Sequence, residues 1–171
     1  VLIDPDKTDS NQLQKTIEAA NKAGVDFFLV GGSLLLKNNL EETILTLKKH
    51  TKKKVYLFPG NPYQISNKAD GILLLSLISG RNADLLIGNH VQAAPLLKQS
   101  KLHIIPTGYM LIDSGTPTTV SYISNTQPIP AHKPEIAACT ALAGEQLGLQ
   151  FIYLEAGSGA QNAVSQETIK A

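Results

Sequence analysis

The sequence predicts an α/β protein built on a parallel sheet. Apolar runs of strand length alternate with amphipathic runs of helix length along the 171 residues, which is the pattern of repeated βαβ units. The apolar runs consist almost entirely of Val, Ile, Leu and Phe, as in strands that are buried on both faces of a parallel sheet. An open doubly wound sheet and a (β/α)8 barrel both fit six such units, although six are too few to close a barrel.

The first half of the chain contains four expected strands and two expected helices. The opening run, Val1–Asp4, is the first strand. In the helix that follows, Leu13, Ile17 and Ala20 share one face, and Gly24 ends the helix. The remaining elements of this half are the strand Phe27–Val30, the helix Leu40–Lys49, and the strands Val55–Phe58 and Ile72–Ser76.

The second half continues the alternation around one irregular segment. Residues 83–97 have a helical pattern that Gly88 and Pro95 weaken. The segment between Asp113 and Pro134 is rich in Thr, Ser and Pro, so we expect an extended insertion there. The regular elements of this half are the strand Leu102–Thr107, the helix Glu135–Leu147 ended by Gly148, the strand Phe151–Glu155 and the helix Asn162–Lys170.

The composition indicates one soluble globular domain over residues 1–171. A hydrophobic content of 43% allows one substantial core. A net charge of +1 is too small for a typical nucleic-acid-binding protein. No apolar stretch reaches the roughly 18 residues of a membrane span. The chain starts inside an apolar run without methionine or a signal-like basic segment, so we expect that an amino-terminal piece is missing.

The single cysteine bears on the location of the protein. Cys139 lies in an apolar run, so we expect it to be buried in the core. A lone cysteine cannot form an intrachain disulfide, and this fits a reducing cytoplasmic setting.

Polar residues at two strand ends near the start of the chain could bind a ligand. Asp4 and Asp6 flank Pro5, and their carboxylates could hold Mg2+ together with a phosphorylated substrate. Capping of the loop or of the next helix is an equally good interpretation. Ser33 follows two glycines, which allow a ligand close to the backbone but also suit a tight turn.

The run Tyr153–Gly159, with the sequence YLEAGSG, is the stronger signal. A carboxylate at the end of a buried strand is costly without a partner, so Glu155 is expected to have a task. Strand alternation places Tyr153 and Glu155 on one side and Leu154 on the other. The glycine-rich turn that follows could bind a phosphate at the start of the next helix, through backbone N–H groups and the Ser158 hydroxyl. Parallel strands would deliver Asp4 and Glu155 to the same rim.

These motifs together resemble the geranylgeranylglyceryl phosphate synthase family, which includes bacterial heptaprenylglyceryl phosphate synthases. The resemblance covers essentially the whole chain and is most specific at Tyr153–Gly159. The motifs that carry it are Asp4–Lys7 (DPDK), Val30–Ser33 (VGGS), Ser79–Asn82 (SGRN), Pro106–Tyr109 (PTGY) and Tyr153–Gly159 (YLEAGSG).

The resemblance implies a TIM barrel that uses Mg2+ to join sn-glycerol 1-phosphate to a polyprenyl diphosphate, forming the first ether bond of an ether lipid. It implies that Asp4 and Ser33 hold the metal and that Glu155 orients and deprotonates the attacking glycerol hydroxyl. Apart from the resemblance, we expect a homo-oligomer, because apolar helix faces are expected to be exposed. The glycerol phosphate would be bound by Tyr153, Leu154, Glu155, Ala156, Gly157, Ser158 and Gly159.

Two departures from the family pattern keep alternatives open. Some members have a lysine two residues before the magnesium aspartate, where this chain has Leu2, and Lys7 is a possible substitute. The family also continues through two more βα units, so we expect a partial barrel domain here. A phosphosugar isomerase or lyase on the same scaffold, and an inactive fragment that serves as an oligomerisation module, are the alternative functions.

Overall fold

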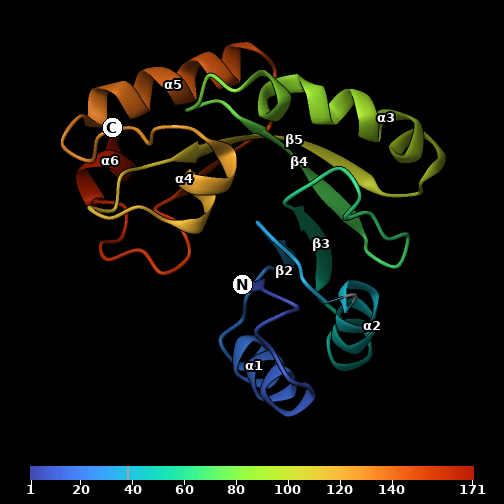
Figure 1. The fold of residues 1–171 in the computed structure, drawn as a ribbon. Helices are drawn as coiled ribbons and strands as arrows, with labels where there is room; N and C mark the ends of the chain where they lie inside the picture. The colour runs from blue at the N-terminus through green and yellow to red at the C-terminus, as the bar shows by residue number, and fades with distance from the viewer. Residues whose placement is uncertain (38) are drawn as a thin grey trace. The chain divides into compact units, whose positions relative to one another are not determined.

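The computed structural model describes residues 1–37 and 39–171, and it contains one sheet whose strands follow the order of the sequence. The sheet order is β1-β2-β3-β4-β5-β6. Strands β2, β3, β4 and β5 are labelled in Figure 1. The strands are β1 (Leu2–Ile3), β2 (Phe27–Gly32), β3 (Lys54–Pro59), β4 (Gly71–Leu77), β5 (His103–Leu111) and β6 (Phe151–Glu155). The helices are α1 (Ser10–Lys22), α2 (Leu40–His50), the π-helix η1 (Asp84–Gly88), α3 (Asn89–Gln99), α4 (Thr119–Ser124), α5 (Pro134–Gln146) and α6 (Gln166–Lys170).

The strand order decides between the two predicted architectures. A doubly wound sheet reverses its strand order at a switch point, whereas a (β/α)8 barrel adds each new strand beside the previous one. The order seen here is sequential, and β1 with β2, β2 with β3, β3 with β4, and β5 with β6 pair in parallel. The fold is therefore TIM-barrel-like, as predicted.

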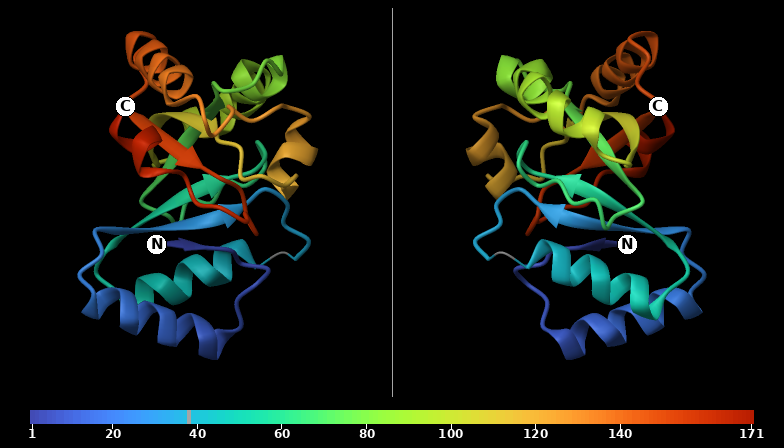
Figure 2. Two further views of the ribbon diagram at one scale, coloured as in Figure 1. Left: turned by 90° about the vertical axis from the view of Figure 1, so that its left-hand side faces the viewer. Right: turned by 90° about the vertical axis from the view of Figure 1, so that its right-hand side faces the viewer.

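The chain divides into two compact units, and the first comprises residues 1–73 and 92–104. Its helices α1 and α2 lie side by side along the strands β1 to β3 (Figure 2). The predicted apolar face of α1 is confirmed, since Leu13, Ile17 and Ala20 are buried. The side chains of Phe28 and Val30 on β2 are fully buried, so this unit has the core that the apolar runs predicted.

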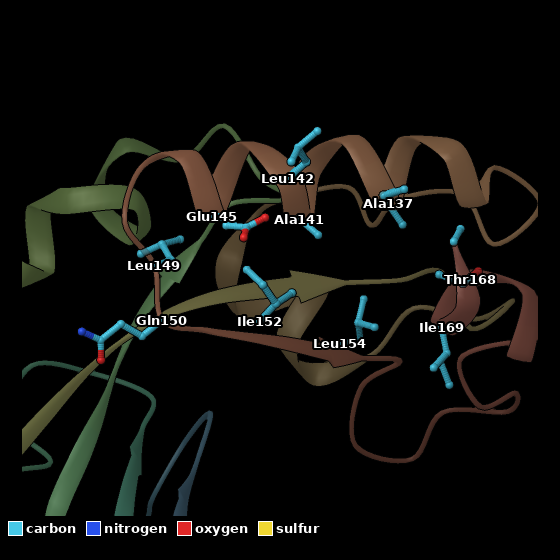
Figure 3. Close-up of a pocket in the computed structure, with 12 residues that line it drawn as sticks. Ala137, Ala141, Leu142, Glu145, Leu149, Gln150, Ile152, Leu154, Thr168 and Ile169 are labelled. Carbon is cyan, nitrogen blue, oxygen red and sulfur yellow. The ribbon is translucent and has the colours of Figure 1, made fainter.

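The second unit comprises residues 74–91 and 105–171. Here α5 covers one side of β6, and Ile152 and Leu154 point toward the helix (Figure 3). They pack against a cluster that includes Met110 and Ala137, and a groove of about 470 Å³ remains between α5, β6 and α6. Strand β6 is only half-buried because it is the last strand in the sheet order, so burial on both faces was a wrong expectation for this strand.

Helix assignments in the second half need two corrections. The segment from Asp113 to Pro134 contains the helix α4, where an extended insertion was expected. A reciprocal pair of hydrogen bonds between Thr118 and Ser121 caps this helix. The helix predicted over Asn162–Lys170 is shorter in the structure. Ser165 is the N-cap of α6, so the helix begins only at Gln166.

The prediction that Cys139 is buried was wrong, because its side chain is exposed on α5. The helix is rich in small apolar residues on all sides, so the sequence did not show which face would be covered. The helices within the described ranges are too short or too polar to cross a bilayer.

Candidate functional site

Asp4 and Ser33 follow neighbouring strands in the first unit. Asp4 follows β1 and Ser33 follows β2, and the two strands pair with Ile3 opposite Val30. A Cβ built on Gly32 would lie 3.5 Å from the Asp4 carboxyl group, so the chain just before Ser33 approaches this carboxylate closely. The structure thus brings the two predicted metal positions to adjacent strand ends.

The hydrogen bonds distinguish Asp4 from Asp6. Asp6 accepts the backbone N–H groups of Leu36 and Lys37 and thereby holds the loop after β2. The α1 helix is capped by Asp9, whose carboxylate accepts the N–H of Gln12 at 2.8 Å, so neither Asp4 nor Asp6 is the helix cap.

The Asp4 carboxylate is oriented yet partly accessible. Its Oδ1 accepts the N–H of Asp6 at 3.0 Å, its Oδ2 lies 3.1 Å from Lys7 Nζ, and the side chain is 24% exposed. A carboxylate and a hydroxyl are hard oxygen donors, which suit Mg2+. Among the residues with described positions, no group of three or more His, Cys, Asp or Glu side chains could hold a metal. A few protein ligands plus substrate phosphate are typical of Mg2+ sites, so the residues present fit this ion.

Glu155 lies in the second unit, at the end of β6, beside two tyrosines. β5 and β6 pair in parallel with Tyr109 opposite Tyr153 and Leu111 opposite Glu155. The rings of Tyr109 and Tyr153 stack with centroids 5.9 Å apart at 12°. The Tyr109 hydroxyl donates a hydrogen bond to the Glu155 carboxylate. The predicted alternation along β6 is confirmed, because Leu154 packs on the opposite, α5 side.

The electrostatics of this group favour a proton on Tyr109 and a shift of Glu155 toward its neutral form. Burial raises the pKa of Glu155, and the hydrogen bond from Tyr109 partly opposes this rise. Burial and the negative charge of Glu155 raise the pKa of Tyr109 far above its usual range. The same two causes raise the pKa of Tyr153. A carboxyl with a raised pKa in such a setting is suited to proton transfer.

The glycine-rich run after Glu155 forms a tight turn. Gly157 and Gly159 have φ angles of 99° and 79°, which favour glycine, and the N–H of Ala160 donates to the Gly157 carbonyl at 3.0 Å. The run was expected at the start of a helix, but α6 begins only at Gln166. An anion would therefore be bound by the turn itself, through its backbone N–H groups and the exposed Ser158.

The segment that follows β5 supports this run, a role that the sequence did not indicate. A Cβ built on Gly157 would lie 2.6 Å from Thr118 Oγ1 and Cγ2. The Asn162 side chain donates to the Ser114 carbonyl at 3.0 Å. A cleft of about 930 Å³ opens between this segment and Ala156. The Thr-x-x-Ser spacing of the α4 cap was the available signal for order in this segment.

Comparison with known proteins gives consistent matches over the whole chain. Residues 1–171 match the PcrB family. The geranylgeranylglyceryl phosphate synthase of Spirosoma linguale is 59% identical over 171 residues, which are 100% of this chain and 69% of that protein. A structure of wild-type GGGPS from Thermoplasma volcanium matches with a TM-score of 0.90 and 35% identity, covering 99% of this chain and 68% of that one.

A second solved structure contains a ligand. It is (S)-3-O-geranylgeranylglyceryl phosphate synthase from Thermoplasma acidophilum in complex with its substrate sn-glycerol-1-phosphate. It matches with a TM-score of 0.90 and 34% identity, covering 99% of this chain and 68% of that chain.

Proposed function

Because this chain belongs to the PcrB family, we propose that it is a prenyltransferase that joins sn-glycerol 1-phosphate to a polyprenyl diphosphate. The product contains the first ether bond of an ether lipid. The observation that carries the proposal is the half-buried Glu155 carboxyl, which Tyr109 holds and which a glycine-rich turn follows directly. The site thus offers a base next to a place for a phosphate.

Glu155 is the base in this proposal. A glycerol hydroxyl attacks C1 of the allylic diphosphate, so an O–C1 bond forms while the bond from C1 to the diphosphate oxygen breaks. The hydroxyl proton passes to the Glu155 carboxylate, and the bonding electron pair leaves with the diphosphate. Burial raises the pKa of Glu155, which makes its carboxylate a stronger base than an exposed glutamate.

Asp4 and Ser33 would hold Mg2+, which when bound neutralises charge on the leaving diphosphate. Asp4 can serve because its carboxylate is oriented by the N–H of Asp6 and is partly open to solvent. Lys7 pairs with Asp4 at 3.1 Å, so its ammonium group already lies beside the proposed diphosphate position. This placement supports Lys7 as the cation that compensates for Leu2.

The turn from Tyr153 to Gly159 would bind the phosphate of sn-glycerol 1-phosphate. Gly157 and Gly159 give the backbone the left-handed conformation that turns N–H groups toward one ligand. Ser158, an exposed residue, contributes a hydroxyl at the same turn.

Two further expectations belong to the same proposal. Leu142 in α5 is 52% exposed, and Leu147, directly after this helix, is 80% exposed. These exposed apolar side chains support a homo-oligomer. Cys139 is free, which fits the expected cytoplasmic location.

A transfer assay with labelled sn-glycerol 1-phosphate and a series of polyprenyl diphosphates tests the proposal. We expect labelled lipid with Mg2+ and none with EDTA. Glu155→Gln should lower kcat about 10²- to 10⁴-fold, the usual contribution of a general base, and Asp4→Asn should raise the Mg2+ concentration needed. Glu145→Gln, on the exposed surface of α5, is the matched control. Full activity of Glu155→Gln, or no transfer by the folded wild-type protein, would refute the proposal.

A further inference from the structure

We infer that Tyr109 is a positioning residue for the proposed base, and that its hydroxyl fixes the Glu155 carboxylate so that one oxygen faces the substrate hydroxyl. This inference rests on the proposed function. A tyrosine hydroxyl donates one hydrogen bond, so it occupies one acceptor position of the carboxylate and leaves the others available.

The register of the sheet places Tyr109 where its side chain can reach Glu155. Tyr109 lies directly opposite Tyr153, and Glu155 is two residues further along the neighbouring strand on the same face. Diagonal neighbours on a sheet are within reach of an aromatic side chain. The Tyr109 hydroxyl therefore comes close enough to donate a hydrogen bond to the Glu155 carboxylate.

Tyr109 is itself rigidly held, as a positioning residue must be. Its side chain is 7% exposed, and its ring stacks on that of Tyr153. On the opposite, α5 side of the strand, an added Cβ on Gly108 would lie 2.8 Å from Ile78 and 2.9 Å from Ile152, so the backbone next to Tyr109 is closely packed. The phenol therefore has little freedom to move away from Glu155.

The chemistry of the pair fits orientation and excludes a role for Tyr109 as the base. Burial and the nearby carboxylate raise the pKa of Tyr109, so the phenol keeps its proton and remains a donor. Among the described residues, the titratable groups known to face Glu155 are Tyr109 and Tyr153. The hydrogen bond from Tyr109 favours the charged carboxylate against the effect of burial.

Tyr109→Phe removes only the hydroxyl and keeps the stacked ring. We expect kcat to fall about 10- to 100-fold, the scale of a misplaced catalytic group, with little change in KM for sn-glycerol 1-phosphate. The acidic limb of the kcat/KM profile should move to higher pH, because Glu155 loses the hydrogen bond that favours its charged form. Tyr63→Phe, at a 78% exposed tyrosine in the turn after β3, is the control and should change neither quantity.

A carbon-13 NMR titration of the Glu155 carboxyl separates this inference from the proposed function. The pKa should be higher in folded Tyr109→Phe than in the wild-type protein, and an unchanged pKa would overturn the inference. In Glu155→Gln, the carbon-13 shift of Tyr109 Cζ should move, which provides the same test if Tyr109→Phe does not fold. An inactive wild-type protein would overturn the proposed function, and the titrations alone would then decide whether Tyr109 holds the carboxylate.

Discussion

Replacement of Gly157 by alanine should destabilise the protein through two separable effects. The residue has a φ of 99°, and holding a non-glycine residue there costs about 1–3 kcal/mol. The new Cβ would also lie 2.6–2.7 Å from three atoms of Thr118, and relieving such overpacking costs about 1–3 kcal/mol more. We therefore expect a total loss of about 2–6 kcal/mol in the free energy of unfolding.

Two comparison variants separate these effects in urea unfolding experiments. Gly159→Ala has a φ of 79° but nothing within 4 Å of the new Cβ, so it should show the backbone strain alone. Thr118→Gly removes all three clashing atoms, and glycine is tolerated at a helix N-cap. In that background Gly157→Ala should cost no more than Gly159→Ala. An equal cost of Gly157→Ala with and without Thr118 would refute the packing argument.

Three further stability predictions rest on other parts of the structure. Burial acts to raise the pKa of Asp70, but hydrogen bonds from Lys48 and the Val55 N–H, both at 2.8 Å, and nearby positive charge outweigh it and lower this pKa. Asp70→Asn should therefore lower the free energy of unfolding by about 1–3 kcal/mol at pH 7. This loss should shrink as the pH falls through the lowered pKa. Burial raises the pKa of Glu155, so this residue stabilises the folded protein below the unfolded pKa of 4.5, and the stabilisation is lost as the pH rises through the folded pKa. Glu155→Gln should therefore unfold at a higher urea concentration than the wild-type protein at pH 8, and the difference should be smaller near pH 4. Met110→Ala should cost about 2–5 kcal/mol in thermal or urea unfolding, because Met110 is fully buried.

Most of the fold could be predicted because the apolar periodicity of each segment agrees with the capping and turn residues at its ends. Leu13 and Ile17 recur at helical spacing, and the helix ends where Gly24 takes a φ of 74°. The sequence predicted α4 poorly, since this short helix depends on the hydrogen bonds between Thr118 and Ser121 against a composition typical of loops. The exposure of the α5 face that carries Cys139 could not be predicted either, because the helix has small apolar residues on all its sides.

The residues of the candidate site could be proposed from the sequence, but the contacts that surround them could not. Glu155 at a strand end before a glycine-rich run is a local pattern that the sequence displays. The partners of this pattern depend on the pairing register of β5 and β6, which places Tyr109 beside it, and on the path of the insertion, which places Thr118 against Gly157. Neither can be read from periodicity.

The hydrogen bond between Asn162 and Ser114 has a consequence for the order of folding. It joins residues 48 positions apart, and Ile112 likewise donates its N–H to the Glu155 carbonyl at 2.8 Å. Contacts between distant positions form late, because closing a long loop costs chain entropy before the contact can compensate for it. During synthesis, Ser114 is made well before Asn162, so the segment that follows β5 can form these contacts only after β6 has been made. We therefore expect the turn that would bind phosphate to be among the last parts of the second unit to become ordered.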